Sequence, residues 1–426
     1  MADDKRDLLD DLIDIQADWQ KLSNPLGDIA SDLTDAASGT RKVFNPADYK
    51  ERPRANSSRC VRCAGVEPTK GSCSLCADVC PTKSIAFTEK AMSLDDRCRK
   101  CGLCVAVCPT EAITGVANTQ RRIYDRVATA ASAYDEAYIT CTRAIKRLPQ
   151  PNEIVLPCVG AVSRDLWFAL LTDYTNVSVY LPLGICDKCR TTTGEQAYSD
   201  AIATAEEWSQ GAVGLEVDAK ALRHEQSRAY KRSQFMSSAI TSAERLVSRS
   251  SPALAGAQAV AKKIQDHSRL LDRLTRSIEN AVGAKTTNNR QRILTNKRKL
   301  MMSALQHDPG LAAYVHLDVP VVDSDRCTVC GDCAKVCTVH ALDITDQGRV
   351  RVEADYCVNC GACVAACHDG ALSMAPCDVK ELVVPDEMTA EVRKRKAEAK
   401  AEADKLVEKG KAQLKKTGDA LEKLDK

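Results

Sequence analysis

The chain has 426 residues, which corresponds to roughly three domains at about 150 residues each. Lys and Arg number 60 and Asp and Glu number 58, so the net charge of +2 argues against a globally basic nucleic-acid-binding protein. No apolar run approaches the roughly 18 residues of a membrane span, and the acidic start lacks the basic and apolar regions of a secretory signal. We therefore expect a cytoplasmic protein with no transmembrane segment.

The chain contains 22 cysteines, which are strongly clustered. Nine lie between Cys60 and Cys108 and nine between Cys327 and Cys377. In a reducing compartment such groups are better explained as metal ligands than as disulfides. The sequence therefore predicts two metal-binding modules separated by about half of the chain.

The first 50 residues begin with a helical pattern. Apolar side chains recur every three or four residues and end before a turn sequence at residues 23–27. The side chains of this stripe are Leu8, Leu12, Ile15, Trp19 and Leu22. We expect a helix that covers a core, with docking to a partner as the alternative.

The first cysteine-rich module contains one complete ligand run, from Cys98 to Cys108. Its C-x2-C-x2-C-x3-C spacing is typical of 4Fe-4S ligands. A cubane needs four thiolates at the corners of a tetrahedron, and one tight loop can supply three of them. The fourth must come from a more distant point of the chain.

The run upstream of it is a damaged copy of the same pattern. Lys70 stands where its first cysteine is expected, and additional cysteines lie further upstream. We interpret this as an insertion in the first ligand loop, which leaves either Cys60 or Cys63 as the missing ligand; Cys63 leaves the shorter loop. A separate zinc-knuckle site is the alternative, built from Cys60, Cys63, Cys73 and Cys76.

Residues 130–200 alternate strand and helix signals. Strands are expected at 137–141, 153–158 and 177–182, and a helix is expected to begin at the cap residue Ser163. Each strand is followed closely by cysteine, and parallel strands end at one edge of their sheet. We therefore expect one metal centre at that edge, with ligands Cys141, Cys158, Cys186 and Cys189.

This stretch resembles the delta iron-sulfur subunit of methyl-viologen-reducing hydrogenase, which relays electrons towards heterodisulfide reductase. The shared features are Pro157-Cys158-Val159-Gly160 before a helix and the CDKC pair at Cys186 and Cys189. The resemblance implies a 2Fe-2S cluster. The alternatives are a structural zinc, unligated thiols and a redox-active CDKC disulfide.

Residues 200–306 are expected to form a run of helices. Within residues 220–300 there are 18 Lys or Arg and five Asp or Glu, a net charge of +13. A solvated helical face is one interpretation, and a docking surface for an acidic redox partner is the other. The basic side chains predicted to dock are Arg290, Arg292, Lys297, Arg298 and Lys299. One apolar helix face is expected from Ile264, Leu271, Leu274, Ile278 and Val282.

The second cysteine-rich module contains two complete ligand runs, separated by 19 residues. Two such runs in tandem resemble bacterial two-cluster ferredoxins, in which the fourth cysteine of each run binds the other cluster. Thr338 and His368 stand where that family usually has proline, so cluster potentials cannot be transferred. The resemblance implies one cluster on Cys327, Cys330, Cys333 and Cys367 and another on Cys357, Cys360, Cys363 and Cys337.

The same resemblance implies two clusters in the first module. One would use Cys98, Cys101, Cys104 and Cys80. The other would use Cys73, Cys76, Cys108 and one of Cys60 or Cys63. Helix-and-strand exits are expected after each fourth cysteine, at residues 81–85, 109–113, 341–342 and 371–372.

The expected fold class is an α+β multidomain chain, in which two dicluster ferredoxin-like modules flank a small α/β cysteine domain and a helical segment, with helical termini. The tail is rich in Lys, Glu and Ala, so we expect a solvated helix or disorder there. The expected segments are 1–50 (N-terminal helix), 55–120 (first ferredoxin-like domain), 130–200 (α/β cysteine domain), 201–310 (basic helical domain), 318–380 (second ferredoxin-like domain) and 388–426 (tail).

The expected function is electron transfer. The sequence has no dinucleotide-binding glycine motif, P-loop lysine or nucleophile elbow, so no catalytic residue is predicted. We expect four 4Fe-4S clusters and a fifth centre, 2Fe-2S or zinc, in the electron-relay subunit of an anaerobic oxidoreductase complex. Its partners would be redox proteins, such as an acidic ferredoxin or a flavoprotein, and not nucleic acid. The alternatives are a catalytic subunit of the heterodisulfide-reductase type and a nucleic-acid-binding protein with structural clusters.

Overall fold

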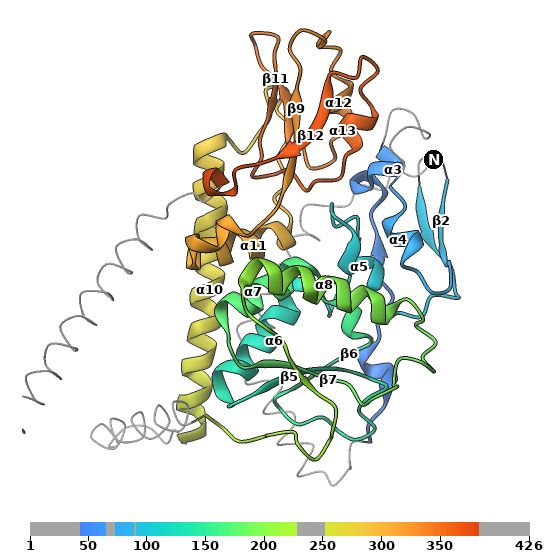
Figure 1. Cartoon of the computed structure of the whole chain (residues 1–426), viewed down its shortest axis with the longest axis vertical. Helices are drawn as coiled ribbons and strands as arrows, with labels where there is room; N and C mark the ends of the chain where they lie inside the picture. The colour runs from blue at the N-terminus through green and yellow to red at the C-terminus, as the bar shows by residue number, and fades with distance from the viewer. Residues whose placement is uncertain (1–42, 65–72, 89–90, 228–251, 383–426) are drawn as a thin grey trace, which may run out of the picture. The chain divides into compact units, whose positions relative to one another are not determined.

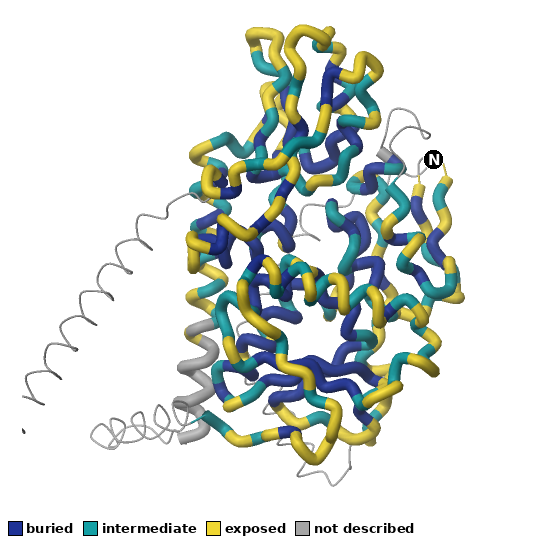
Figure 2. The backbone as a smooth tube through the Cα atoms, in the orientation of Figure 1, coloured by how far each residue is buried: buried dark blue, intermediate teal, exposed yellow. Residues whose placement is uncertain are grey.

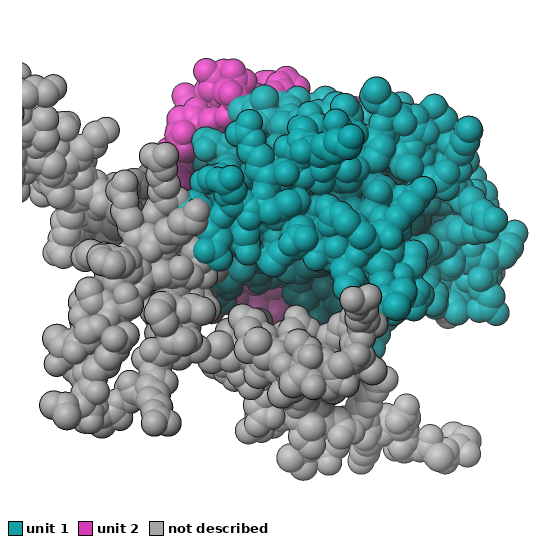
Figure 3. Space-filling model, turned by 90° about the horizontal axis from the view of Figure 1, so that it is seen from below, with its two compact units in different colours: residues 1–57, 74–206, 211–268 teal, residues 58–73, 207–210, 269–426 magenta. Residues whose placement is uncertain are grey.

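The computed structural model describes residues 43–64, 73–88, 91–227 and 252–382. It divides into two compact units, shown in different colours in Figure 3. Unit 1 comprises residues 1–57, 74–206 and 211–268, and unit 2 comprises residues 58–73, 207–210 and 269–426. The helix expected at the start of the chain and the tail from residue 388 lie outside the described residues.

Unit 1 begins with short elements around the first cysteine module. Strands β2 and β3 pair antiparallel, as do β1 and β4. Two short helices, α4 and α5, carry cysteines. The bounds are η1 Pro46–Tyr49, β1 Arg54–Ala55, α4 Leu75–Asp78, β2 Ile85–Phe87, β3 Met92–Leu94, α5 Leu103–Val107 and β4 Ile113–Thr114.

A four-stranded parallel sheet forms the second part of unit 1, in the order β6-β5-β7-β8. Residues of β5, β6 and β7 are buried throughout, as expected for a parallel sheet covered on both faces (Figure 2). The parallel pairing predicted for the first three strands is confirmed, although β6 is an edge strand and β5 is central. The bounds are β5 Ala137–Cys141, β6 Glu153–Leu156, β7 Val177–Tyr180 and β8 Gly214–Glu216.

Capped helices pack beside this sheet. The predicted cap is confirmed, because the Ser163 hydroxyl accepts a hydrogen bond from the Leu166 N–H at the start of α7 (Arg164–Asp173). Thr119 caps α6 (Gln120–Ala133) in the same way. Helices α6 and α7 contact each other, and α6 contacts β5 and β6 (Figure 1). The short η3 (Val159–Ala161) follows Cys158, and α8 (Gly194–Ser209) follows the CDKC pair.

The sheet also carries an aromatic cluster. Tyr138, Val155 and Tyr180 come from three neighbouring strands and pack with Ile145 and Leu222. Phe44 and Tyr49, from the start of the described chain, pack against this cluster.

The expectation of helices throughout residues 200–306 is wrong at β8. Strand β8 is only three residues long, which is too short to show an alternation of apolar and polar residues. It forms by pairing with β7. Such a short strand depends on tertiary contacts that local sequence does not reveal.

Unit 2 contains the second cysteine module. Strand β9 pairs antiparallel with β12, and β10 pairs antiparallel with β11. Helices α12 and α13 contact each other and carry the third cysteine of each ligand run. The bounds are η2 Ser57–Arg59, α3 Val61–Ala64, β9 Asp318–Val322, α12 Asp332–Val336, β10 Leu342–Ile344, β11 Val350–Val352, α13 Ala362–Ala365, β12 Leu372–Pro376 and η5 Val379–Leu382.

Longer helices precede this module in the chain. Helix α10 (Pro252–Val282) belongs to unit 1 up to Ser268 and to unit 2 from Arg269. Its predicted apolar face is buried at Leu271, Leu274 and Ile278. Helix α11 (Asn296–His307) is followed by η4 (Pro309–Ala313). Among the described helices, none is both long and apolar enough to cross a membrane.

The molecule therefore has a mixed α+β fold with small sheets.

Candidate iron-sulfur sites

Three cysteine runs share one backbone conformation. The residue after the second cysteine is a left-handed glycine in each run, with φ of +84° at Gly102, +83° at Gly331 and +70° at Gly361. The residue before that cysteine is also left-handed in each run, at Lys100, Val329 and Asn359. Non-glycine residues are strained there, so the loop conformation is held in place by its surroundings.

The backbone has the same conformation after the fourth cysteine of each of the four runs. The backbone N–H four residues later donates a hydrogen bond to the cysteine sulfur, and a strand begins at the next residue. Such N–H groups favour a thiolate over a thiol. The N···S distances are 3.4 Å at Cys80 and 3.2 Å at Cys108, Cys337 and Cys367. The strands of the expected exits are present in all four positions, but turns stand where short helices were expected.

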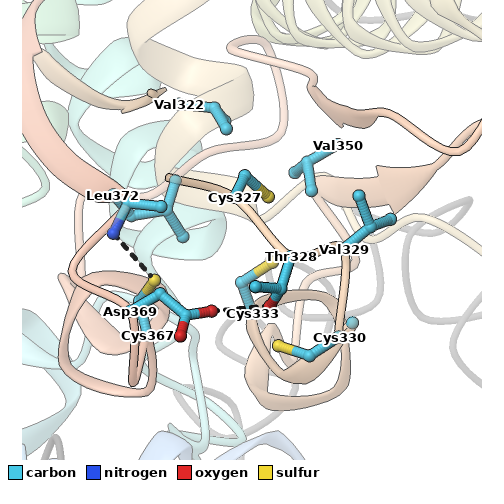
Figure 4. A pocket seen from close by; sticks show the side chains of 12 residues that line it. Val322, Cys327, Thr328, Val329, Cys330, Cys333, Val350, Cys367, Asp369 and Leu372 are labelled. Carbon is cyan, nitrogen blue, oxygen red and sulfur yellow. Dashed lines mark hydrogen bonds between the residues drawn. The ribbon is translucent and has the colours of Figure 1, made fainter. Parts of the chain in front are cut away.

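In unit 2, one cavity is lined by the first three cysteines of the first run and the fourth of the second. Their side chains surround a common space (Figure 4). The cavity has about 340 Å³ of empty space and includes Val322, Val350 and Leu372 in its apolar lining. The cysteines are Cys327, Cys330, Cys333 and Cys367.

A second cavity in unit 2 is lined by the complementary set, Cys337, Cys357, Cys360 and Cys363. Its empty space is about 310 Å³. Cys363 interacts electrostatically with the other three thiols, and burial raises its pKa to about 12. The two runs therefore exchange their fourth cysteines in space, as the ferredoxin resemblance implies.

A cavity of the same kind in unit 1 is lined by Cys80, Cys98, Cys101 and Cys104. Its empty space is again about 310 Å³. Burial raises the pKa of Cys80, but hydrogen bonds from Ser84 and Thr82 outweigh it, so the pKa falls below its ordinary value. Burial raises the pKa of Cys104.

The remaining cysteines of the first module are divided between the units. Cys60, Cys63 and Cys73 belong to unit 2, whereas Cys76 and Cys108 belong to unit 1. The Cys63 N–H donates to the Cys60 carbonyl at 3.1 Å. The assignment of a fourth cubane to these residues stays a prediction, as does the choice between Cys60 and Cys63.

The four middle cysteines converge at the carboxyl edge of the parallel sheet. Cys141 is the last residue of β5, Cys158 lies two residues beyond β6, and the CDKC pair follows β7. Cys158 and Cys186 each interact electrostatically with Cys141 and Cys189. Burial raises the pKa of Cys158 to about 12 and that of Cys186 to about 11. The four thiols therefore lie near one another at this edge, and a shared metal centre stays a prediction.

Two other residues shape this middle site, and neither was predicted from the sequence. The Tyr198 hydroxyl, one turn into α8, donates a hydrogen bond to the Cys186 sulfur. Gly194 leaves room for Cys158, because a Cβ there would lie 2.8 Å from the Cys158 Sγ. The only available signal was their position directly after the CDKC pair, where a helix begins.

A single metal ion and a cubane need their thiolates at different spacings. A tetrahedral zinc with bonds of about 2.3 Å holds its sulfurs about 3.8 Å apart, and a cubane spreads them further. Within residues 43–64, 73–88, 91–227 and 252–382, no group of three or more His, Cys, Asp or Glu could hold one metal ion.

The predicted basic docking run is wrong for three of its five members. Arg292, Lys297 and Arg298 are buried, whereas Arg290 is exposed and Lys299 is half-buried. Arg292 forms ion pairs with Asp343 (3.4 Å) and Glu353 (3.6 Å). Arg298 donates to the Asp355 and Ala354 carbonyls at 3.1 and 2.9 Å. A dense run of cations looks alike in sequence whether it faces solvent or packs against acidic and carbonyl groups.

Comparison with known protein families gives two matches. A model described as a 4Fe-4S dicluster domain matches residues 326–371. A model described as an LdpA Fe-S cluster-binding domain matches residues 70–119. No curated protein and no solved structure matches the chain. The chain therefore contains a 4Fe-4S dicluster domain in the second cysteine module and an iron-sulfur cluster-binding domain in the first.

Proposed function

We propose that this protein is an iron-sulfur electron-transfer protein whose cysteine modules carry four 4Fe-4S clusters. The observation that carries the proposal is the set of three cavities of nearly equal size, each lined by four cysteines. Two of them exchange their fourth cysteines between runs, which a two-cluster ferredoxin requires. The cubane ligands proposed are Cys63, Cys73, Cys76, Cys80, Cys98, Cys101, Cys104, Cys108, Cys327, Cys330, Cys333, Cys337, Cys357, Cys360, Cys363 and Cys367.

The middle thiols are proposed to hold a fifth centre of the 2Fe-2S type. Their convergence at one sheet edge supports a shared centre, and the resemblance to the hydrogenase delta subunit supports two irons. On this proposal the protein is the cytoplasmic electron-relay subunit of an anaerobic oxidoreductase complex. Its partners would be redox proteins, among them an acidic ferredoxin or a flavoprotein.

Metal analysis of the full chain, purified without oxygen, tests the proposal. We expect roughly 16 irons per chain from the four cubanes, and roughly 18 with the two-iron centre. Zinc in a stoichiometric amount together with about eight irons would contradict it. The isolated protein should accept and donate single electrons without turning over a disulfide substrate, whereas a catalytic heterodisulfide-reductase subunit would show turnover.

A further inference from the structure

Two loops of unit 1 that carry cysteines are in direct contact. Helix α5 carries Cys104, the third cysteine of the first module's complete run. It contacts η3, which lies beside Cys158. A Cβ on Gly102 would lie 2.8 Å from the Ala161 Cβ, and a Cβ on Gly160 would lie 2.5 Å from the Leu103 Cδ2. Each loop therefore uses a glycine where the other approaches, and neither position has room for a side chain.

Candidate ligands stand at both ends of this contact. Cys101 directly precedes Gly102, and Cys158 lies two residues before Gly160. The two thiols interact electrostatically across the contact. The first belongs to the four-cysteine cavity of the first module and the second to the middle site.

Hydrogen bonds hold the chain on either side of this contact in place. The Gln120 side-chain amide donates to the Ala161 carbonyl at 2.8 Å and accepts from the Ser163 N–H at 2.9 Å, so it holds both ends of the turn after η3. The Thr193 hydroxyl, beside the middle site, donates to the Val79 carbonyl next to Cys80.

The contact is also dry. Leu103, Val159 and Ala161 are between 0 and 3% exposed, and such packing leaves no gap for water between the loops. Electron tunnelling weakens steeply with distance and with gaps in packing. A short, filled and hydrogen-bonded contact between two ligand loops therefore favours transfer between their centres.

We propose that the cubane on Cys80, Cys98, Cys101 and Cys104 exchanges electrons directly with the middle centre, across the contact of Gly102 and Leu103 with Gly160 and Ala161. In each step a reduced cubane loses one electron and the oxidised middle centre gains it; no bond is made or broken. An external one-electron carrier reduces the cubane beforehand. This inference rests on the proposed function, because it requires a redox centre at the middle site.

Electron paramagnetic resonance spectra of the full chain, fully reduced with dithionite, test whether the cubane and the middle centre are neighbours. Two reduced centres this close broaden each other's signals. The double variant Cys141→Ser/Cys189→Ser removes the middle centre without altering the contact, and one cubane signal should then narrow and relax more slowly. If iron falls by about two per chain and every cubane signal keeps its shape, the direct pairing is overturned. If iron does not fall at all, the middle centre itself is absent and the proposed function fails at that site.

A matched pair of glycine variants tests the contact itself. Gly160→Ala forces the loops apart, so transfer from the photoreduced cubane to the middle centre should slow several-fold while iron content is kept. Gly115→Ala is the control, because a Cβ there would meet Glu51 Oε1 at 2.6 Å in the same unit but outside the contact. If Gly160→Ala does not slow electron transfer, the route is overturned. If Gly115→Ala slows it as much as Gly160→Ala does, the route is overturned as well.

Discussion

The two cysteine modules differ in the backbone conformation of one ligand loop. In unit 2 both sets of four cysteines line a cavity. In unit 1 the set that includes the complete run lines a cavity, and the cysteines expected for the other cluster are divided between the units. The backbone difference lies at a single position in the loop. Where the three complete runs have a left-handed glycine, the damaged run has Ser74, with φ of −117° and ψ of −1°.

This comparison shows what a cluster loop requires beyond cysteine spacing. The spacing of Cys73, Cys76 and Cys80 matches the last three cysteines of a complete run. A residue with a Cβ at the glycine position cannot easily take the left-handed turn, and the chain there takes a right-handed conformation instead. The ligand loop of the damaged run therefore differs in backbone even though its thiols are in sequence order.

The largest expected effect comes from breaking the exchange of fourth cysteines in unit 2. Cys367→Ser should remove the cluster of the run that begins at Cys327 and spare the cluster of its own run, because Cys367 lines the other run's cavity. Iron should fall by about four per chain. Electron paramagnetic resonance spectra show which clusters remain, and those of Cys367→Ser should match those of Cys327→Ser. If Cys367→Ser and Cys327→Ser leave different clusters, the exchange is wrong. Cys377→Ser, a thiol outside both cavity linings, is the control and should keep all the iron.

The next effect separates the two candidate ligands of the damaged run. Cys63→Ser should lower the iron content by about four per chain, and Cys60→Ser should lower it little, because the loop from Cys63 to Cys73 is shorter. Iron and acid-labile sulfide, measured on both variants purified side by side, decide between them. The opposite ranking would make Cys60 the ligand. Loss of zinc from both variants would favour the zinc-knuckle alternative.

The sequence predicted the parts of the structure that repeat. The spacing of the cysteines predicted which of them line the cavities of unit 2 and the cavity of the complete run in unit 1. The alternation of strand and helix signals predicted the parallel pairing of β5, β6 and β7. It failed where tertiary contacts decide. Strand β8 exists through its pairing with β7, Arg292 and Arg298 are buried by groups distant in sequence, and Gly160 has its meaning only beside Leu103. None of these contacts leaves a local pattern.

A reciprocal exchange of glycine and serine sharpens the comparison of the modules. Gly331→Ser places a Cβ in a left-handed loop and 3.0 Å from the Ile344 Cδ1, which costs about 1–2 kcal/mol. The cluster nearest to it should lose iron faster in air. Ser74→Gly removes the barrier in the damaged run and should slow loss of the fourth cluster. Rates of bleaching in air, followed by iron analysis, check both. Faster bleaching of Ser74→Gly would show that Ser74 supports its loop.

The smallest expected effect concerns the two clusters of unit 2, which differ in their charged neighbours. The guanidinium of Arg298 is buried, donates to the carbonyls of Ala354 and Asp355, and interacts electrostatically with Cys357. A buried cation stabilises the reduced cluster, which carries one more negative charge. At an effective dielectric constant near 20 and a separation of about 10 Å this amounts to roughly 1.7 kcal/mol, or about 70 mV for one electron.

Arg298→Gln should therefore lower the midpoint potential of one cubane by about 70 mV and leave the cubane on the other cavity near its original value. Lys299→Gln, on the next residue of α11, is the matched control because its ammonium is half-buried and solvent screens it. Redox titration monitored by resonance checks the shift, and Arg298→Lys should restore part of it, since the charge returns without both hydrogen bonds. If both cubanes shift equally, or if Lys299→Gln acts as strongly as Arg298→Gln, the asymmetry between the clusters does not come from this guanidinium. The carboxylates of Asp332 and Asp369, which lie beside the other ligand run, would then be the next groups to neutralise.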